Sequence, residues 1–207
     1  MAEQQVFPTK GNLILSKKAL KLAAMGYELL DRKRNILIRE LMGLVGKAES
    51  LRNSIEDTYK EAYRELQLAN ISMGIITPFA SCIPVENGVE LSSKSVMGVE
   101  LPKVTLEEKP LQVNYGFART NSQLDKAYMA FDKVKKITVT LAEVENSIYR
   151  LSVAIKKTQR RANALQNIII PRHEKTVKFI SDSLEEKERE EFSRMKVIKA
   201  VKIQNGQ

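Results

Sequence analysis

Two long stretches of the chain repeat apolar residues every seven positions, and this repeat limits how the chain can fold. A strict period of seven keeps an apolar row facing one partner only when helices wind around each other with a left-handed supercoil. Two such helices in one chain most simply fold back on each other. The sequence therefore predicts an all-α fold, a long antiparallel left-handed two-helix coiled coil. The main residues of its apolar contact, which we call the seam, are Leu30, Leu37, Leu41, Leu44, Leu51, Leu141, Ile148, Leu151, Ile155 and Leu165.

The segment between the two stretches has a different pattern. Thr77-Pro78, Ile83-Pro84 and Asn87-Gly88 are pairs typical of turns. Between residues 89 and 104 the apolar residues alternate with polar ones, which predicts a small β-hairpin at the closed end of the coiled coil. Its turn is expected either within residues 92–95 or at Met97-Gly98, and the sequence leaves both positions open.

These patterns divide the chain into five parts. We expect an N-terminal extension over 1–11, a first long helix over 12–74, the insert over 75–119, a second long helix over 120–203 and a frayed tail over 204–207. Thr9 or Asn12 can cap the first helix, and Thr120 or Asn121 the second. Pro171 lacks a backbone donor, so a kink is expected near it.

The chain carries a formal net charge of +9, and the positive charge is concentrated in one region. Basic residues are most dense between residues 150 and 178. Folding back at the insert would bring Leu30 near Arg161 and Leu13 near Lys178, so this band would lie beside the basic start of the first helix. Like charges on both helices need a partner of opposite or carbonyl-rich character. The end of the rod that carries both termini is therefore a predicted docking surface.

Catalytic motifs are absent from the sequence. It contains no glycine-rich phosphate loop and no nucleophile elbow, and His173 and Cys82 are its only histidine and cysteine. No catalytic residue, metal or cofactor is expected. The single cysteine fits a reducing cytoplasm, and no apolar run is long enough for direct insertion into a membrane.

Two binding functions compete once catalysis is set aside. Nucleic-acid binding fits the net charge, but the basic stretches lack interleaved aromatic residues and no helix-turn-helix or zinc pattern is present. We expect no nucleic-acid partner. A coiled-coil tether or adaptor that docks an acidic partner through the basic band is the stronger alternative, although a plain tether needs neither the band nor the strand-like insert.

Several strings of residues resemble one family over nearly the whole chain. They are PTKGNLILSKKALKLAAMGYELLDRKRNIL from Pro8, VMGVELPKV from Val96, RRANALQNIIIPRHEKTVKFI from Arg160 and LEEKEREEFSRMKVIK from Leu184. Together they resemble the D subunits of the V-type ATPases and of the related A/V-type ATP synthases. The resemblance implies a non-catalytic central-stalk component, a rotor that transmits torque between the catalytic ring and the membrane rotor.

The resemblance also implies partners and a location. The end with the termini would enter the ring of A and B subunits, and the other end would bind the F subunit and the C subunit, which is called d in eukaryotes. The protein would be cytoplasmic and peripheral to the membrane. We expect Lys17, Lys18, Arg32, Arg34, Arg160 and Arg161 to face the ring. We expect Val96, Met97, Gly98 and Val99 of the insert to contact the rim of the ring or the F subunit, and the insert to matter little for holding the rod together.

Overall fold

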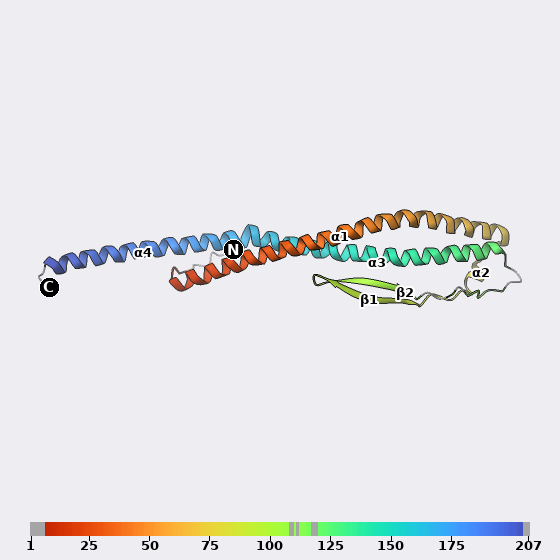
Figure 1. Ribbon diagram of the computed structural model, residues 1–207, viewed down its shortest axis with the longest axis horizontal. Coiled ribbons are helices and arrows are strands. Elements are labelled where there is room, and N and C mark those ends of the chain that lie inside the picture. Colours follow the sequence, from red (N-terminus) through yellow and green to blue (C-terminus); the bar gives the residue numbers. More distant parts are fainter. Residues whose placement is uncertain (1–6, 108–109, 111, 117–119, 205–207) are drawn as a thin grey trace. The chain divides into compact units, whose positions relative to one another are not determined.

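The computed structural model describes residues 7–107, 110, 112–116 and 120–204, so most of the predicted tail lies outside the described residues (Figure 1). It is 79% helical. The elements are α1 (Lys10–Met73), α2 (Thr77–Ala80), β1 (Val89–Val96), β2 (Val99–Leu106), α3 (Ser122–Ala164), a π-helical segment η2 (Leu165–Ile169) and α4 (Ile170–Gln204). Long helices with one small antiparallel hairpin agree with the predicted class, and the supercoil itself stays a prediction. The predicted place of the hairpin at the closed end is wrong, because Val96 and Val99 beside its turn pack against Leu37, about half-way along α1.

Polar side chains mark the beginnings of the long helices, as the sequence indicated. Oγ1 of Thr9 accepts a hydrogen bond of 3.2 Å from the backbone N–H of Asn12, so Thr9 caps α1. The helix begins at Lys10, two residues before the predicted start. Asn121 precedes α3, and its side-chain oxygen accepts a hydrogen bond of 2.7 Å from the N–H of Ser122. The caps are therefore Thr9 and Asn121.

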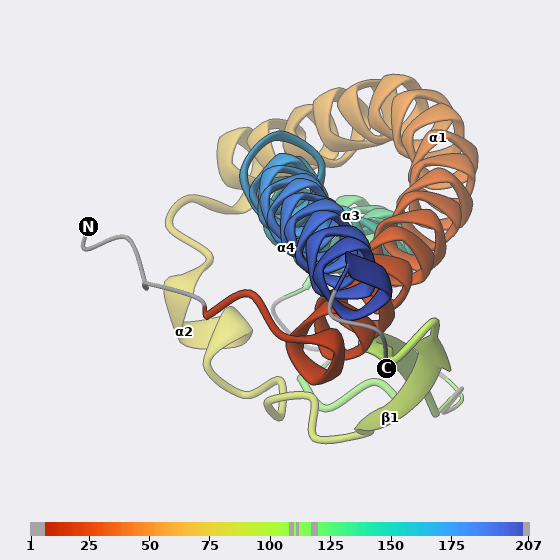
Figure 2. The same ribbon diagram turned by 90° about the vertical axis from the view of Figure 1, so that its left-hand side faces the viewer.

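The chain divides into two compact units, of which the first combines Met1–Arg34 with Lys157–Gln207. Within it the start of α1 runs antiparallel to α4 (Figure 2). Arg34 donates a hydrogen bond of 3.2 Å to Gln159, and a Cβ on Gly26 would lie 3.7 Å from a methyl of Leu165. These two contacts lie on either side of Leu30 along α1, and they agree with the predicted pairing of Leu30 with Arg161. The core of this unit includes Ala162 and Ile180, both fully buried.

The π-helical segment shifts the buried face of the second long helix. If the repeat of α3 continued unchanged, Ile169 and Phe179 would be buried, yet they are 37% and 57% exposed. The residues that follow them are covered instead, since Ile170 is half-buried and Ile180 fully buried. A π turn holds one more residue than an α turn, which accounts for this shift of one position. The chain stays helical through Pro171, and the irregularity lies in the five residues of η2 before α4.

The second unit, Asn35–Lys156, packs the rest of α1 against α3. The hydroxyls of Tyr59 and Thr138 lie 3.0 Å apart, and Arg52 pairs with Glu145 at 3.4 Å, so these helices are also antiparallel. The seam residue Leu37 is fully buried. Its counterpart on α3, Leu151, is also fully buried, and the other eight seam residues are half-buried.

The hairpin reverses direction at Met97-Gly98, so the alternative turn within residues 92–95 is wrong. Both turn residues have positive φ, 50° and 75°, as a two-residue turn of type I′ requires. Leu101 of β2 packs with Leu37 and Leu151 and is only 8% exposed. The expectation that the insert takes little part in holding the rod together is therefore wrong, because its β2 strand contributes to the core.

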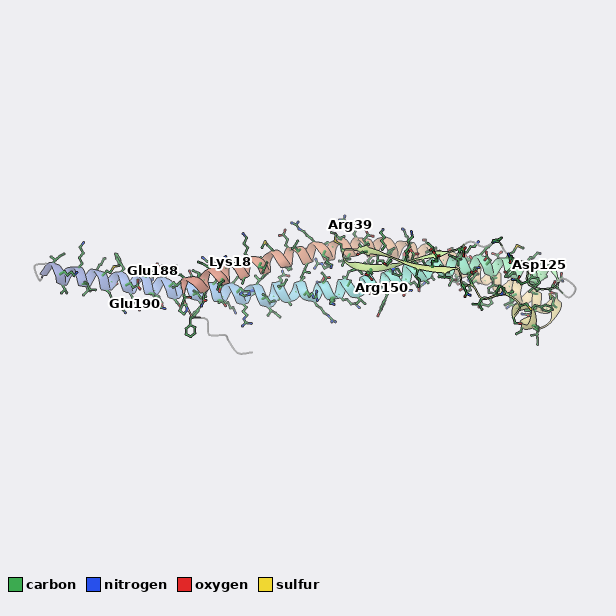
Figure 3. All side chains as sticks on the ribbon, turned by 90° about the horizontal axis from the view of Figure 1, so that it is seen from below. Lys18, Arg39, Asp125, Arg150, Glu188 and Glu190 are labelled. Atoms are coloured by element: carbon green, nitrogen blue, oxygen red, sulfur yellow. The ribbon has the colours of Figure 1, made fainter. Side chains whose placement is uncertain are left out.

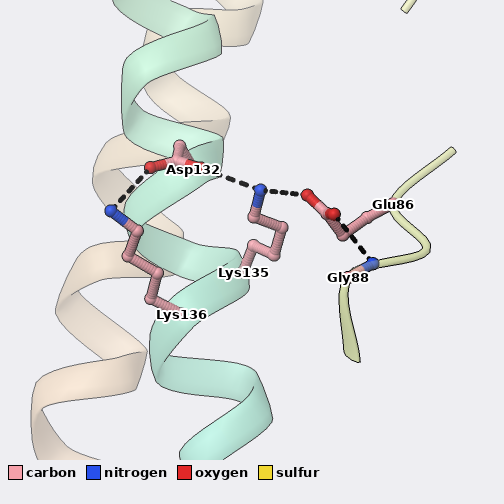
Figure 4. Close-up of polar contacts among 5 residues, drawn as sticks. All are labelled: Glu86, Gly88, Asp132, Lys135 and Lys136. Atoms are coloured by element: carbon pink, nitrogen blue, oxygen red, sulfur yellow. Dashed lines mark hydrogen bonds and ion pairs between the residues drawn. The ribbon is translucent and has the colours of Figure 1, made fainter. Parts of the chain in front are cut away.

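A chain of ion pairs joins the insert to α3 (Figure 4). Lys135 lies 2.9 Å from carboxylate oxygens of both Glu86 and Asp132, and Lys136 lies 3.2 Å from Asp132. Hydrogen bonds to Glu86 and Asp132 raise the pKa of Lys135. Burial alone would raise the pKa of Asp132, but hydrogen bonds from the two lysines outweigh burial and lower it. Glu86 also accepts a bond of 3.1 Å from the N–H of Gly88, which fixes the entry to β1.

A second cluster lies where α1 ends and α3 begins. Ala69, Ile76, Tyr115 and Leu124 are all buried there, with Ile76 just before the short helix α2, which the sequence did not predict. The hydroxyl of Tyr115 donates a hydrogen bond of 2.6 Å to Asp125. Burial and this bond raise the pKa of Tyr115, so the hydroxyl stays protonated and keeps donating. The cluster therefore fixes the loop before α3 against the end of α1.

Candidate partner-binding surfaces

Five of the six basic residues expected to face a partner are exposed. Lys17, Lys18 and Arg32 lie on the outer surface of α1, and Arg160 and Arg161 on that of α3. Figure 3 shows Lys18 on the first part of α1. The cation of Arg32 pairs with Glu28 one turn before it, and both side chains remain more than half exposed. All five belong to the first unit, so the fold keeps them available to a partner.

Arg34, the sixth of these basic residues, lies differently. Its side chain is 24% exposed and pairs with Asp31 on the same helix, while it donates a hydrogen bond of 3.2 Å to Gln159 on α3. Arg34 interrupts an apolar row of the first helix, and these contacts explain how a cation is accommodated there. Its contacts fit a role within the first unit better than one at a partner surface.

A second apolar row on α1 faces solvent, and the seam pattern did not predict it. Leu15, Leu22 and Leu29 follow one another at intervals of seven and are 63%, 68% and 66% exposed. Lys18 and Arg32 occupy the row three residues further on, so apolar and cationic side chains alternate over this face. The sequence does contain this row as a second seven-residue repeat of leucines. One covered row and one open row on the same helix indicate contact with two different neighbours.

The far part of α4 is exposed throughout. Every described side chain from 185 to 203 is exposed, including large apolar ones such as Phe192, Val197 and Ile198 at 56%, 63% and 56%. At 100° per residue these apolar residues point in several directions around the helix. Clusters of exposed apolar side chains commonly mark a contact with another protein, even where charged residues such as Glu190 and Arg194 lie among them. This segment therefore presents a surface that a surrounding partner would cover.

The four hairpin residues expected to bind a partner differ in their surroundings. Val96 and Val99 are half-buried against the cluster of Leu37, Leu101 and Leu151. Met97 is 48% exposed and Gly98 is exposed, so only the turn itself projects toward solvent. The valines thus connect the turn to the helices, and the turn is the part open to contact.

Within 7–107, 110, 112–116 and 120–204, no three His, Cys, Asp or Glu side chains gather as metal ligands would. In the same ranges no helix is both long enough and apolar enough to cross a membrane.

Long paired helices with open apolar and basic rows define a helical protein that assembles with other proteins. The family model for the ATP synthase D subunit matches residues 12–200. The V-type ATP synthase D subunit of Thermotoga neapolitana is 45% identical over 196 residues, which cover 94% of this chain and 97% of the relative. The A-type ATP synthase D subunit of Pyrococcus furiosus is 39% identical over 202 residues, 95% of this chain and 94% of that one.

The chain therefore belongs to the family of ATP synthase D subunits. It is a central-stalk component of a rotary ATPase of the V or A type, and so a stalk component of an enzyme complex.

Proposed function

We propose that this chain is the non-catalytic shaft that transmits torque between a ring of A and B subunits and the ion-translocating rotor in the membrane. The observation that carries the proposal is the exposed surface of the first unit, where open apolar rows and five exposed basic residues occur together. A shaft that turned inside a ring would need such a surface at the inserted end. Burying a leucine fully between the helices stabilises their contact by about 1.5–3 kcal/mol. Two helices held together in this way resist twisting better than one.

The far part of α4 supports insertion into a ring. Phe192, Val197 and Ile198 point in different directions around the helix and are all more than half exposed. A flat docking site would cover one side only, whereas a ring encloses a helix on every side. The apolar positions around α4 therefore favour a surrounding partner.

The basic residues suit a contact that changes as the shaft turns. Lys17, Lys18, Arg160 and Arg161 carry long side chains that can exchange partners in a wet interface without a fixed pocket. An asymmetric shaft would contact three similar catalytic sites differently and so favour a different conformation at each. The turn of the hairpin would then contact the rim of the ring or the F subunit, and the C subunit, called d in eukaryotes, would link the shaft to the membrane sector. This assembly would place the protein in the cytoplasm, peripheral to the membrane.

The test is a combined replacement of Lys17, Lys18, Arg32, Arg160 and Arg161 by alanine, followed by reconstitution with the remaining subunits. We expect weaker assembly or poorer coupling of ATP hydrolysis to ion pumping. A control variant replaces Lys47, Lys126 and Lys133, which lie in the second unit, and should pump normally. Normal pumping by the first variant would refute the assignment of these residues.

A tether that docks an acidic partner remains the alternative function, because the basic surface alone would serve it equally well. Affinity purification of the tagged chain from its own cells separates the two. Recovery of A and B subunits with ATPase activity supports the shaft. Recovery of other partners without ATPase activity would favour the tether.

A further inference from the structure

The two edges of the hairpin can be told apart from its hydrogen-bonding pattern. Val96 and Val99 flank the two-residue turn, so they form a hydrogen-bonded pair, and such pairs then alternate along the ladder. The carbonyl of Gly88 accepts a bond of 2.9 Å from the N–H of Glu107, which extends the same alternation beyond the strands. The remaining residues turn their backbone groups outward. On β1 these are Val89, Leu91, Ser93 and Ser95.

The outer edge of β2 is partly covered by side chains of α3. The carbonyl of Glu100 accepts a hydrogen bond of 3.1 Å from Arg150, and the N–H of Val104 donates one of 2.8 Å to Glu143. Between them lies Pro102, which has no N–H to offer. Figure 1 shows β2 on the side of the hairpin nearer to α3. Two helix side chains thus bond two of the outward groups of β2, and Pro102 removes a third.

The outer edge of β1 is open. Among the residues that the structure describes, no hydrogen-bond partner reaches the outward backbone groups of Val89, Leu91, Ser93 or Ser95, and all four residues are exposed. The strand contains no proline, and its pairing with β2 runs without a bulge from Val89 to Val96. Proteins usually protect such an edge with a proline, a bulge or charged side chains, because an open edge can pair with a strand of another chain. Here a proline and two helix side chains protect β2, whereas β1 has only the charged side chains of Glu90 and Lys94.

Apolar surface lies next to this open edge. Leu91 is 76% exposed and Val89 43% exposed, although both belong to a strand. With Val104, Val139 and other residues of β2 and α3, they line a hollow of about 380 Å³. Glu90 and Lys94 alternate with them and therefore lie on the other face of the sheet. A strand added beside β1 would cover Leu91 with an apolar side chain and place opposite charges against Glu90 and Lys94.

A second copy of the chain fits this edge less well. In an antiparallel pair of two β1 strands, the register that pairs Glu90 with Lys94 sets Leu91 opposite Ser93 of the other copy. The register that pairs the two Leu91 side chains moves the charges out of contact. Self-pairing can therefore satisfy the charges or the apolar residues, but not both together.

We propose that β1 binds an extended strand from a different component of the ATP synthase, which adds to the hairpin as a third strand. This inference rests on the proposed function and gives the contact of the hairpin a specific form. The added segment lacks proline at its pairing positions, is apolar opposite Leu91, and carries a base and an acid opposite Glu90 and Lys94.

Amide hydrogen exchange in the assembled complex tests the proposal. The N–H groups of Leu91 and Ser93 point outward, whereas those of Ser92 and Lys94 are already bonded to β2 and serve as internal controls. Assembly should slow exchange at Leu91 and Ser93 by about tenfold or more relative to the isolated chain, with a much smaller change at the controls. Protection that alternates in this way reports backbone pairing, since simple covering would slow neighbouring amides together.

A proline variant provides the second measurement. Ser93→Pro removes one outward donor without touching the ladder to β2, and it places a proline opposite the natural Pro102. Ser93→Thr keeps the donor and is the matched control. Ser93→Pro should abolish the protection at Leu91 in the complex, while Ser93→Thr retains it and both variants keep the helical circular dichroism of the original chain.

Three other outcomes would overturn the strand pairing, the choice of partner, or both proposals. An intact complex with fast exchange at Leu91 and Ser93 would overturn the strand pairing and leave the shaft function standing. Protection of the same amides in the isolated chain, together with dimers in sedimentation, would overturn the choice of partner. A chain that joins no other component of the ATP synthase would overturn both proposals.

Discussion

The replacement of Leu37 by alanine tests which side of α1 stabilises the fold. Leu37 is fully buried with Leu101 and Leu151, so truncation removes packing that the helix, the strand and α3 share. Losing about three carbon groups at about 0.8 kcal/mol each gives about 2.4 kcal/mol, and the cavity left behind raises the expected loss to about 3 kcal/mol. Leu29 is the matched control, because it lies on the same helix but is 66% exposed. Leu29→Ala should change the free energy of unfolding by less than about 0.5 kcal/mol, since alanine and leucine have similar helix propensities.

Urea unfolding followed by circular dichroism measures both variants. With a slope of roughly 3 kcal/mol per molar urea, Leu37→Ala should lower the midpoint by about 1 M, and Leu29→Ala should leave it nearly unchanged. The reasoning about the packed and open rows would be refuted if the two variants shifted the midpoint equally. Under the proposed function, Leu29→Ala should weaken assembly with the A and B subunits while leaving the stability of the isolated chain nearly unchanged.

Three further predictions concern the ends, the turn and the ion pairs. Thr9→Ala should cost the start of α1 about 1 kcal/mol, seen as amide exchange about fivefold faster at Asn12, because it removes the cap. Met97→Asn should raise the urea midpoint slightly and Gly98→Ala should lower it, because both positions have positive φ and Asn-Gly suits this turn. Asp132 has a lowered pKa in the fold, so its contribution is present at neutral pH and is lost as the pH falls through that lowered pKa. Asp132→Asn should therefore remove up to about 1 kcal/mol of stability at pH 7 and show less further loss below about pH 4, measured by urea unfolding across pH.

Much of the helical fold could be predicted because the apolar repeat is long and regular. Leu37 and Leu151 lie where the seam predicted them, and Thr9 and Asn121 have the side chains that helix caps require. These features depend on residues close together in the sequence. The same local reasoning located the hairpin between residues 89 and 104, since alternation by two is also a short-range pattern.

The turn, the role of Leu101 and the open row depended on information that local patterns lack. Met97 takes a positive φ, which is uncommon for a residue other than glycine, so the sequence could not decide between the two turn positions. Leu101 is buried because the hairpin folds back onto α1 and α3, and that contact joins residues far apart in the chain. The repeat of Leu15, Leu22 and Leu29 was visible, but a periodic row does not reveal whether the chain itself or a partner covers it.

The π-helical segment determines how the second long helix tolerates the insertion or deletion of single residues. Because Leu165–Ile169 holds one additional residue, the side chains that follow it are rotated by about one residue's turn relative to those before it. Removing any single residue here would restore a plain helix and turn Ile180 away from the core, although no side chain in the core had been altered. The burial of Ala162 and Ile180 thus depends on how many residues separate them as much as on which residues they are. Substitutions in this stretch should be tolerated far more readily than single-residue insertions or deletions.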